Sequence, residues 1–276
     1  AISAVSLVDS INILVIQAFY ALAAGGAIVC SQYLGQEDHK NAMETARQLL
    51  FVVAAIAAAV MTLCLVFRDP LLALIFGSVE ADVMEAAQTY FFYTAISFPF
   101  IALYDAGSSV YRAQGNTRLP MTIALISNCL NIAGNAVLIW GFQMGVAGAA
   151  IATLGSRVIS AVAVLIFLRH RDQLLVVRNY RTIRPERRRI VTILSLGIPN
   201  GVENSMFQFG KLAIQSTVST MGTVAIAAQA MTNILVNLNG IAGMGIGIGM
   251  MTVVGQCMGA GRKEEGYAVM ASSMML

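Results

Sequence analysis

Charged residues are scarce in this sequence. They make up 11% of its 276 residues, whereas hydrophobic residues make up 58%. An ordinary soluble domain is about 25% charged, because a chain folded in water needs polar groups to cover its surface. The shortage of charge therefore excludes an ordinary soluble fold and favours a protein whose outer surface faces lipid.

Side chains that bind metals or catalyse reactions are also few. Both histidines, His39 and His170, fall in predicted loops. The four cysteines form no C-x-x-C pair, and we interpret them as buried free thiols. No nucleophile is paired with a base inside an apolar segment. We therefore expect neither an enzyme nor a metal site, and no cofactor.

Long apolar runs, by contrast, are abundant. A bilayer core about 30 Å thick needs roughly 20 apolar residues of helix, and these runs are too long to be barrel strands. The sequence therefore predicts an all-α, polytopic transmembrane helix bundle, with Pro99 and Pro199 inside helices. The predicted spans cover residues 5–34, 47–67, 87–112, 119–140, 145–168, 191–220 and 224–258, and an eighth begins near 266.

Basic residues are distributed unevenly between the predicted loops. Alternate loops contain nearly all of them, including the eight arginines between positions 169 and 189, whereas the loops between these contain only Arg68. The positive-inside rule places the basic loops in the cytoplasm. We therefore predict a multi-pass protein of the plasma (inner) membrane with loop 169–190 in the cytoplasm. The arginines of this loop reflect topology, and we expect no nucleic-acid partner.

One order of features occurs twice along the chain. Asn-Ile-Leu-Val begins at position 12 and again at position 233, and each copy leads into a patch of small residues. Each copy then ends in Gln-x-x-Gly, at residues 32–35 and 256–259. Six predicted helix starts separate the copies, so both copies cross the membrane in the same direction. This arrangement is a parallel repeat, which predicts two lobes of helices.

The repeat divides the chain into three parts. We expect an internal piece of a longer protein, incomplete at both ends, because the chain opens into one apolar run and ends inside another. The predicted parts are an N-terminal lobe at 1–170 that lacks its first helix, a basic cytoplasmic linker at 171–190, and the start of a C-terminal lobe at 191–276.

Several segments resemble the multidrug and toxic compound extrusion (MATE) family. Residues 111–121, Tyr-Arg-Ala-Gln-Gly-Asn-Thr-Arg-Leu-Pro-Met, are similar to the family's arginine–glycine–threonine–proline loop before its fifth helix. Residues 128–155 combine an Asn-rich face with Gly-Val-x-Gly-Ala-Ala-x-Ala-Thr, which is similar to the family's helix 5 to helix 6 signature. The Gln-x-x-Gly helix ends match as well. The resemblance covers about helices 2 to 8 and the start of helix 9.

The resemblance implies a transporter of two lobes around an outward-facing cleft. It would export cationic or amphipathic drugs or metabolites by secondary active transport, in exchange for Na⁺ or H⁺. A lipid-linked oligosaccharide or polysaccharide flippase of the same superfamily is the alternative. Asn135 stands where many members have an aspartate, and Phe207 stands where others have an acid. The coupling ion therefore stays open, as does the oligomeric state.

A polar stripe in span 191–220 supplies the first candidate residues. Polar side chains inside a membrane span are costly, so they are functional candidates. At about 100° per residue, Asn200, Asn204, Gln208 and Lys211 fall on one face, and Glu203 lies about 60° away. The stripe is expected to line a cleft or to form a packed polar seam. Glu203 would attract a cation or take up a proton.

A second set of candidates lies in the N-terminal half. Asn128, Asn131 and Asn135 share one helical face, at positions i, i+3 and i+7. They would coordinate a cation, hydrogen-bond a drug, or join helices through polar contacts. Asp105 lies in the middle of a span, where it is either a proton carrier or the buried partner of an arginine. Arg157 is one candidate for that partner.

Overall fold

The computed structural model describes residues 2–76, 81–169, 175, 185–219 and 223–274. Within these ranges the chain forms helices and no strand. Five of the helices are long and apolar enough to cross a membrane. The predicted all-α bundle is therefore confirmed.

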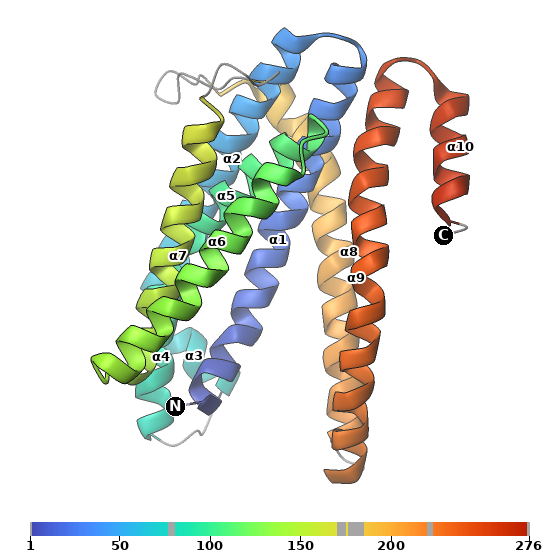
Figure 1. Ribbon diagram of the computed structural model, residues 1–276. Helices are drawn as coiled ribbons and strands as arrows, with labels where there is room; N and C mark the ends of the chain where they lie inside the picture. The colour runs from blue at the N-terminus through green and yellow to red at the C-terminus, as the bar shows by residue number, and fades with distance from the viewer. Residues whose placement is uncertain (1, 77–80, 170–174, 176–184, 220–222, 275–276) are drawn as a thin grey trace.

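The helices follow the predicted spans closely (Figure 1). Each long apolar run forms one helix, except the third run, which forms two, and the fourth, whose α-helix continues into a short π-helix. In chain order the helices are α1 (Ile2–Gly35), α2 (His39–Val66), α3 (Arg68–Phe76), α4 (Ala81–Ile96), α5 (Phe98–Ala113), α6 (Arg118–Asn135), the π-helix η1 (Ala136–Gly141), α7 (Gly145–Phe167), α8 (Arg187–Ser219), α9 (Thr223–Gly259) and α10 (Lys263–Met274).

Helix α1 is the central element of the structure. It packs against α2, α4 and α5 in the N-terminal bundle and against α8 and α9 beyond it. The core of the bundle includes Phe19 of α1 and Phe98 of α5, whose ring centroids lie 6.1 Å apart in an edge-on arrangement. Lipid is as apolar as these side chains, so close van der Waals packing holds the helices together.

The third predicted span, 87–112, is broken, so the expectation that Pro99 lies inside one continuous helix was wrong. Helix α4 ends at Ile96, and α5 begins at Phe98 with Pro99 in its first turn. Proline cannot donate the backbone hydrogen bond of a helix interior, and its ring clashes with the preceding turn. At the break, the Thr94 carbonyl accepts both the backbone N–H of Ser97 at 3.1 Å and its hydroxyl at 2.6 Å. The expectation holds for Pro199, which lies inside α8.

Helix α6 is poorly covered. It packs mainly against α7, and few of its residues are buried among the described helices. Cys129 is exposed on it, whereas Cys30 of α1 is buried. All four cysteines are free, but the expectation that all four are buried holds only for Cys30, because Cys64 and Cys257 are half-buried and Cys129 is exposed.

The basic connections lie at one end of the molecule. The α1–α2, α5–α6 and α9–α10 turns and the adjoining ends of α7 and α8 are together at the top of Figure 1. The α6–α7 link lies at the opposite end, where Gln143 and Gly145 both have positive φ angles. This arrangement is the one that alternating basic loops require. Most of the predicted linker 171–190 lies outside the described residues.

Small residues let α1 and α9 meet closely at the basic end. A Cβ atom on Gly35 would overlap the backbone of Gln256, and a Cβ on Gly259 would overlap the backbone of Gln32. The contacting residues occupy corresponding positions in the two Gln-x-x-Gly copies, and both helices run upward in Figure 1. The two copies therefore meet at corresponding positions and in the same direction, which is the arrangement that a parallel repeat predicts.

Candidate functional site

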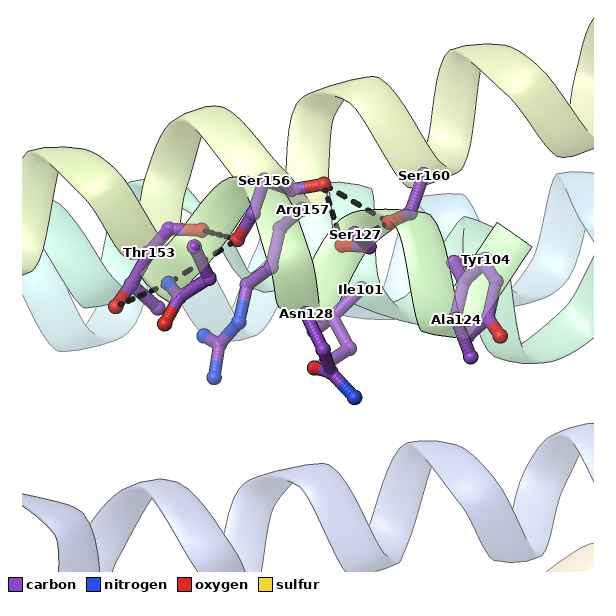
Figure 2. A pocket seen from close by; sticks show the side chains of 10 residues that line it. Ile101, Tyr104, Ala124, Ser127, Asn128, Thr153, Ser156, Arg157 and Ser160 are labelled. Atoms are coloured by element: carbon purple, nitrogen blue, oxygen red, sulfur yellow. Dashed lines mark hydrogen bonds between the residues drawn. The ribbon is translucent and has the colours of Figure 1, made fainter. Parts of the chain in front are cut away.

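A pocket of about 310 Å³ lies within the N-terminal bundle, between α5, α6 and α7 (Figure 2). This volume is at the lower end of the range for sites that bind small molecules. The pocket combines apolar and polar side chains. Its lining residues are Ile101, Tyr104, Ala124, Ser127, Asn128, Asn131, Thr153, Ser156, Arg157 and Ser160.

Helical periodicity explains why these residues meet. Helices α6 and α7 each supply four lining residues at positions i, i+3, i+4 and i+7, which fall on one face of a helix. The two faces lie against each other. They consist of Ala124, Ser127, Asn128 and Asn131 from α6, and of Thr153, Ser156, Arg157 and Ser160 from α7.

Hydrogen bonds join the two faces. The Ser160 hydroxyl donates to Ser127 Oγ at 2.7 Å, and the Ser127 hydroxyl donates to the Ser156 carbonyl at 3.1 Å. The Asn131 amide donates to Thr153 Oγ1 and Ser156 Oγ, both at 3.4 Å. These contacts fix α6 against α7 and hold the polar wall of the pocket in place.

The three predicted asparagines therefore have different surroundings. Asn131 links the two helices, and the Asn135 amide donates to Asn131 Oδ1 at 3.0 Å. Asn135 does not line the pocket, and its Oδ1 is buried without a hydrogen bond to any described residue. Asn128 lines the pocket and forms no hydrogen bond with the described part of the chain. Its amide is free to contact a bound molecule.

Arg157 is the charged residue of the pocket lining. Its Nη1 donates to Ser97 Oγ at 2.6 Å, across to the break between α4 and α5. The guanidinium extends from α7 to the same side as the amide of Asn128 (Figure 2). No carboxylate of the described residues lies within 4.0 Å of it.

Asp105 lies on α5 beside the pocket rather than in its lining. Its Oδ2 atom is buried and has no hydrogen-bond partner in the described chain. The ion pair with Arg157 that the sequence suggests does not form within the described ranges. A buried carboxylate oxygen without a partner is costly, and it is a natural acceptor for a proton or a cation.

The second predicted set lies elsewhere, on α8. Asn200, Asn204 and Gln208 are half-buried on one face, and the Asn204 amide donates to Asn200 Oδ1 at 3.1 Å. Glu203 and Lys211 are exposed, and Lys211 Nζ lies 4.8 Å from the ring centroid of Phe207. Helix α8 packs mainly against α1, so the structure does not bring this stripe together with the α5–α7 pocket.

The serines of the pocket and the contact from Arg157 to Ser97 were not predicted from the sequence. Ser156 and Ser160 are one turn apart, on the same face as Thr153 and Arg157. That spacing in an apolar run is a detectable signal of a polar helix interface. The Ser97 contact joins residues 60 positions apart, so no local pattern indicates it.

Comparison with known proteins agrees with this architecture. The family model described as MatE matches residues 1–137 and 199–276. Over 270 residues the chain is 26% identical to Uncharacterized transporter YisQ of Bacillus subtilis, covering 96% of the chain and 59% of that protein. Over 285 residues it is 27% identical to Probable multidrug resistance protein NorM of Thermotoga maritima, covering 100% of the chain and 60% of that protein.

Solved structures share the fold. The crystal structures of MATE in the bent conformation and of MATE in complex with MaL6 match with TM-scores of 0.91 and 0.93, at 21% and 20% identity. Each covers 99% of this chain, which spans about three fifths of the length of these relatives. The match of the family model to both lobes, on a bundle with the same fold, shows that the chain belongs to the MatE family, the multidrug and toxic compound extrusion proteins.

Proposed function

We propose that the protein is a secondary active transporter that exports cationic or amphipathic small molecules in exchange for Na⁺ or H⁺. The observation that carries this proposal is the family match over a membrane bundle that encloses a polar pocket. The name of the Thermotoga relative, a probable multidrug resistance protein, supports drugs as substrates. The basic end of the bundle supports a plasma (inner) membrane location with that end in the cytoplasm.

The two lobes provide a route for the substrate. Helices α8 and α9 meet α1 closely at the basic end and diverge from the N-terminal bundle toward the opposite end (Figure 1). A substrate path between such lobes, opened alternately to each side, is the usual arrangement in transporters built from repeats. The half-buried amides of Asn200, Asn204 and Gln208 would face this path.

Acidic side chains would couple the substrate to the ion gradient. Asp105 has an unpartnered buried oxygen, and Glu203 is exposed on α8 without an ion pair to any described residue. A carboxylate can bind either the coupling ion, a proton or Na⁺, or the cationic group of the substrate, but not both at once. Uptake of the ion is therefore linked to export of the substrate. We assign the main coupling role to Asp105 and a role in attracting cations to Glu203.

Efflux from proteoliposomes tests this proposal. The full-length protein is expected to export a cationic dye when a Na⁺ gradient or an H⁺ gradient is imposed, and to stop when the gradient collapses. Asp105→Asn is expected to abolish most of the gradient-driven efflux, and Glu203→Gln to weaken it. Asp69→Asn, a change at an exposed acid of α3, is the matched control and is expected to leave efflux unchanged. Efflux that responds to neither gradient contradicts the antiport proposal.

One observation favours the flippase alternative. Arg157 is the charged group of the pocket, and lipid-linked sugars carry anionic diphosphate groups. The same vesicles, loaded with a fluorescent lipid-linked oligosaccharide, distinguish the two functions. Movement of that lipid without dye efflux would replace the antiporter by a flippase.

A further inference from the structure

Arg157 has hydrogen-bonding capacity that the described structure does not use. A guanidinium has five N–H donors, and the one described side-chain contact of Arg157 is its bond to Ser97 Oγ. A charged side chain inside a membrane helix is costly unless a partner compensates it. The unused donors belong to a residue that lines the pocket, so a bound molecule can reach them.

Neighbouring acids do not satisfy this arginine. Asp9 and Asp105 are the carboxylates near enough to act on its charge, and the Tyr90 phenol beside Asp9 is neutral. Asp9 Oδ1 accepts hydrogen bonds from the Tyr90 hydroxyl at 3.1 Å and from the Asn12 amide at 3.3 Å. Neither Asp9 nor Asp105 forms an ion pair with Arg157 in the described chain. The two carboxylates therefore partly compensate the positive charge of Arg157 but do not accept hydrogen bonds from its N–H groups.

The remaining lining fits a molecule with one anionic end. The lining contains no carboxylate, and Asn128 adds a free amide on the same side as the guanidinium (Figure 2). Ile101, Ala124 and the ring of Tyr104 provide apolar surface beside these donors. Ser97 holds the guanidinium in place at the α4–α5 break, which reduces the cost of ordering it on binding.

We propose that this pocket binds an oxyanion, a carboxylate or a phosphate carried by the transported molecule, with Arg157 as its charge partner and Asn128 as a second donor. Arginine suits this role because its planar fork matches the two oxygens of such a group. The inference rests on the proposed transport function and adds amphipathic anions and zwitterions to its substrates. A zwitterion would place its anionic end here and its cationic end toward the acidic groups.

Equilibrium binding to the full-length protein in detergent tests the inference, with dansylglycine as a fluorescent carboxylate and its methyl ester as the uncharged match. The wild-type protein is expected to bind the acid at least about tenfold more tightly than the ester. Arg157→Gln is expected to remove this preference, Arg157→Lys to retain part of it, and Asn128→Ala to weaken it. Arg262→Gln, at an exposed arginine in the α9–α10 turn, is expected to change nothing.

The outcomes separate this inference from the proposed function. The oxyanion site is contradicted if the wild-type protein binds acid and ester equally, or if Arg157→Gln keeps the preference for the acid. In either case another part of the protein neutralises the arginine. Selective binding without gradient-driven efflux supports the oxyanion site and contradicts antiport. Competition with geranyl diphosphate identifies the source of the oxyanion. If geranyl diphosphate displaces bound dansylglycine at a far lower concentration than unlabelled carboxylate does, the oxyanion belongs to a prenyl-diphosphate lipid. Thermal unfolding of Arg157→Lys and Arg157→Gln at the same temperature as the wild-type protein confirms that the variants fold.

Discussion

At the scale of single residues, Asp38 determines how α2 begins. Its carboxylate accepts the backbone N–H of Asn41 at 3.0 Å and the side-chain amide of the same residue. The backbone hydrogen bond, followed by the side-chain bond, lowers the pKa of Asp38 from 3.8. Such a cap satisfies one of the N–H groups that a helix start leaves without a partner.

Replacing Asp38 by Ala is expected to lower the thermal unfolding temperature of the protein in detergent. Because the folded-state pKa is lowered, the stabilisation is complete above the unfolded pKa of about 3.8 and is lost as the pH falls through the folded value. The difference between wild type and Asp38→Ala should therefore be larger at pH 6 than at pH 3. Asp38→Asn, which keeps a capping oxygen without the charge, should show little of this pH dependence.

The pocket shows what residue patterns can and cannot predict. The spacing of Asn128 and Asn131 placed both on one face, and both line the pocket. The same rule grouped Glu203 and Lys211 near a polar stripe, yet both are exposed and unpaired with each other in the described chain. Periodicity gives the direction of a side chain around its own helix, whereas its partners depend on which helix packs there.

At the scale of helices, the crossing of α1 and α9 depends on the absence of side chains. We expect Gly35→Ala and Gly259→Ala to destabilise the protein by about 1–3 kcal/mol, since each added methyl overlaps the opposing backbone. Gly155→Ala in α7 is the control, because a Cβ there meets no atom of the described chain within 4 Å. Alanine is the better helix former, so this change should be neutral or slightly stabilising.

Thermal unfolding in detergent measures these three variants side by side. If Gly259→Ala and Gly155→Ala shift the unfolding temperature equally, the close approach of α1 and α9 is absent in solution. The gel-filtration elution volume of each variant shows whether any loss reflects aggregation rather than weaker packing.

The α4–α5 break marks the limit of prediction for single helices. The apolar length of residues 87–112 indicates a membrane span, and the structure contains helix across most of it. A proline inside a span either kinks one helix or separates two, and neighbouring residues decide which. Here Ser97 satisfies the carbonyl of Thr94 and accepts Arg157 from a distant helix, and neither contact is visible in the local sequence.

At the scale of the whole molecule, the alternating basic loops predict which end faces the cytoplasm. In a cysteine-free background, Arg262→Cys at the α9–α10 turn should react with an impermeant maleimide only when the cytoplasmic side is exposed. Gln143→Cys, at the opposite end and also exposed, should react from outside in intact cells. Labelling of both from the same side would contradict the orientation.

The repeat was the most informative whole-molecule signal, because an ordered set of features twice along the chain specifies the direction of both copies. It could not show that the copies touch. Whether the copies touch depends on the distance between the two lobes, and no feature of the sequence indicates that distance.

The α1–α9 crossing has a consequence for how such a chain arises. Each Gln-x-x-Gly segment rests on its own counterpart, so the surface there is self-complementary, as in an isologous homodimer. If an ancestor contained only one copy, two such chains would have formed a dimer through this contact. A bulky substitution in that chain would then have appeared on both sides of the contact at once. In the present chain the two sides are separate stretches of sequence, so a substitution can change one side of the contact alone.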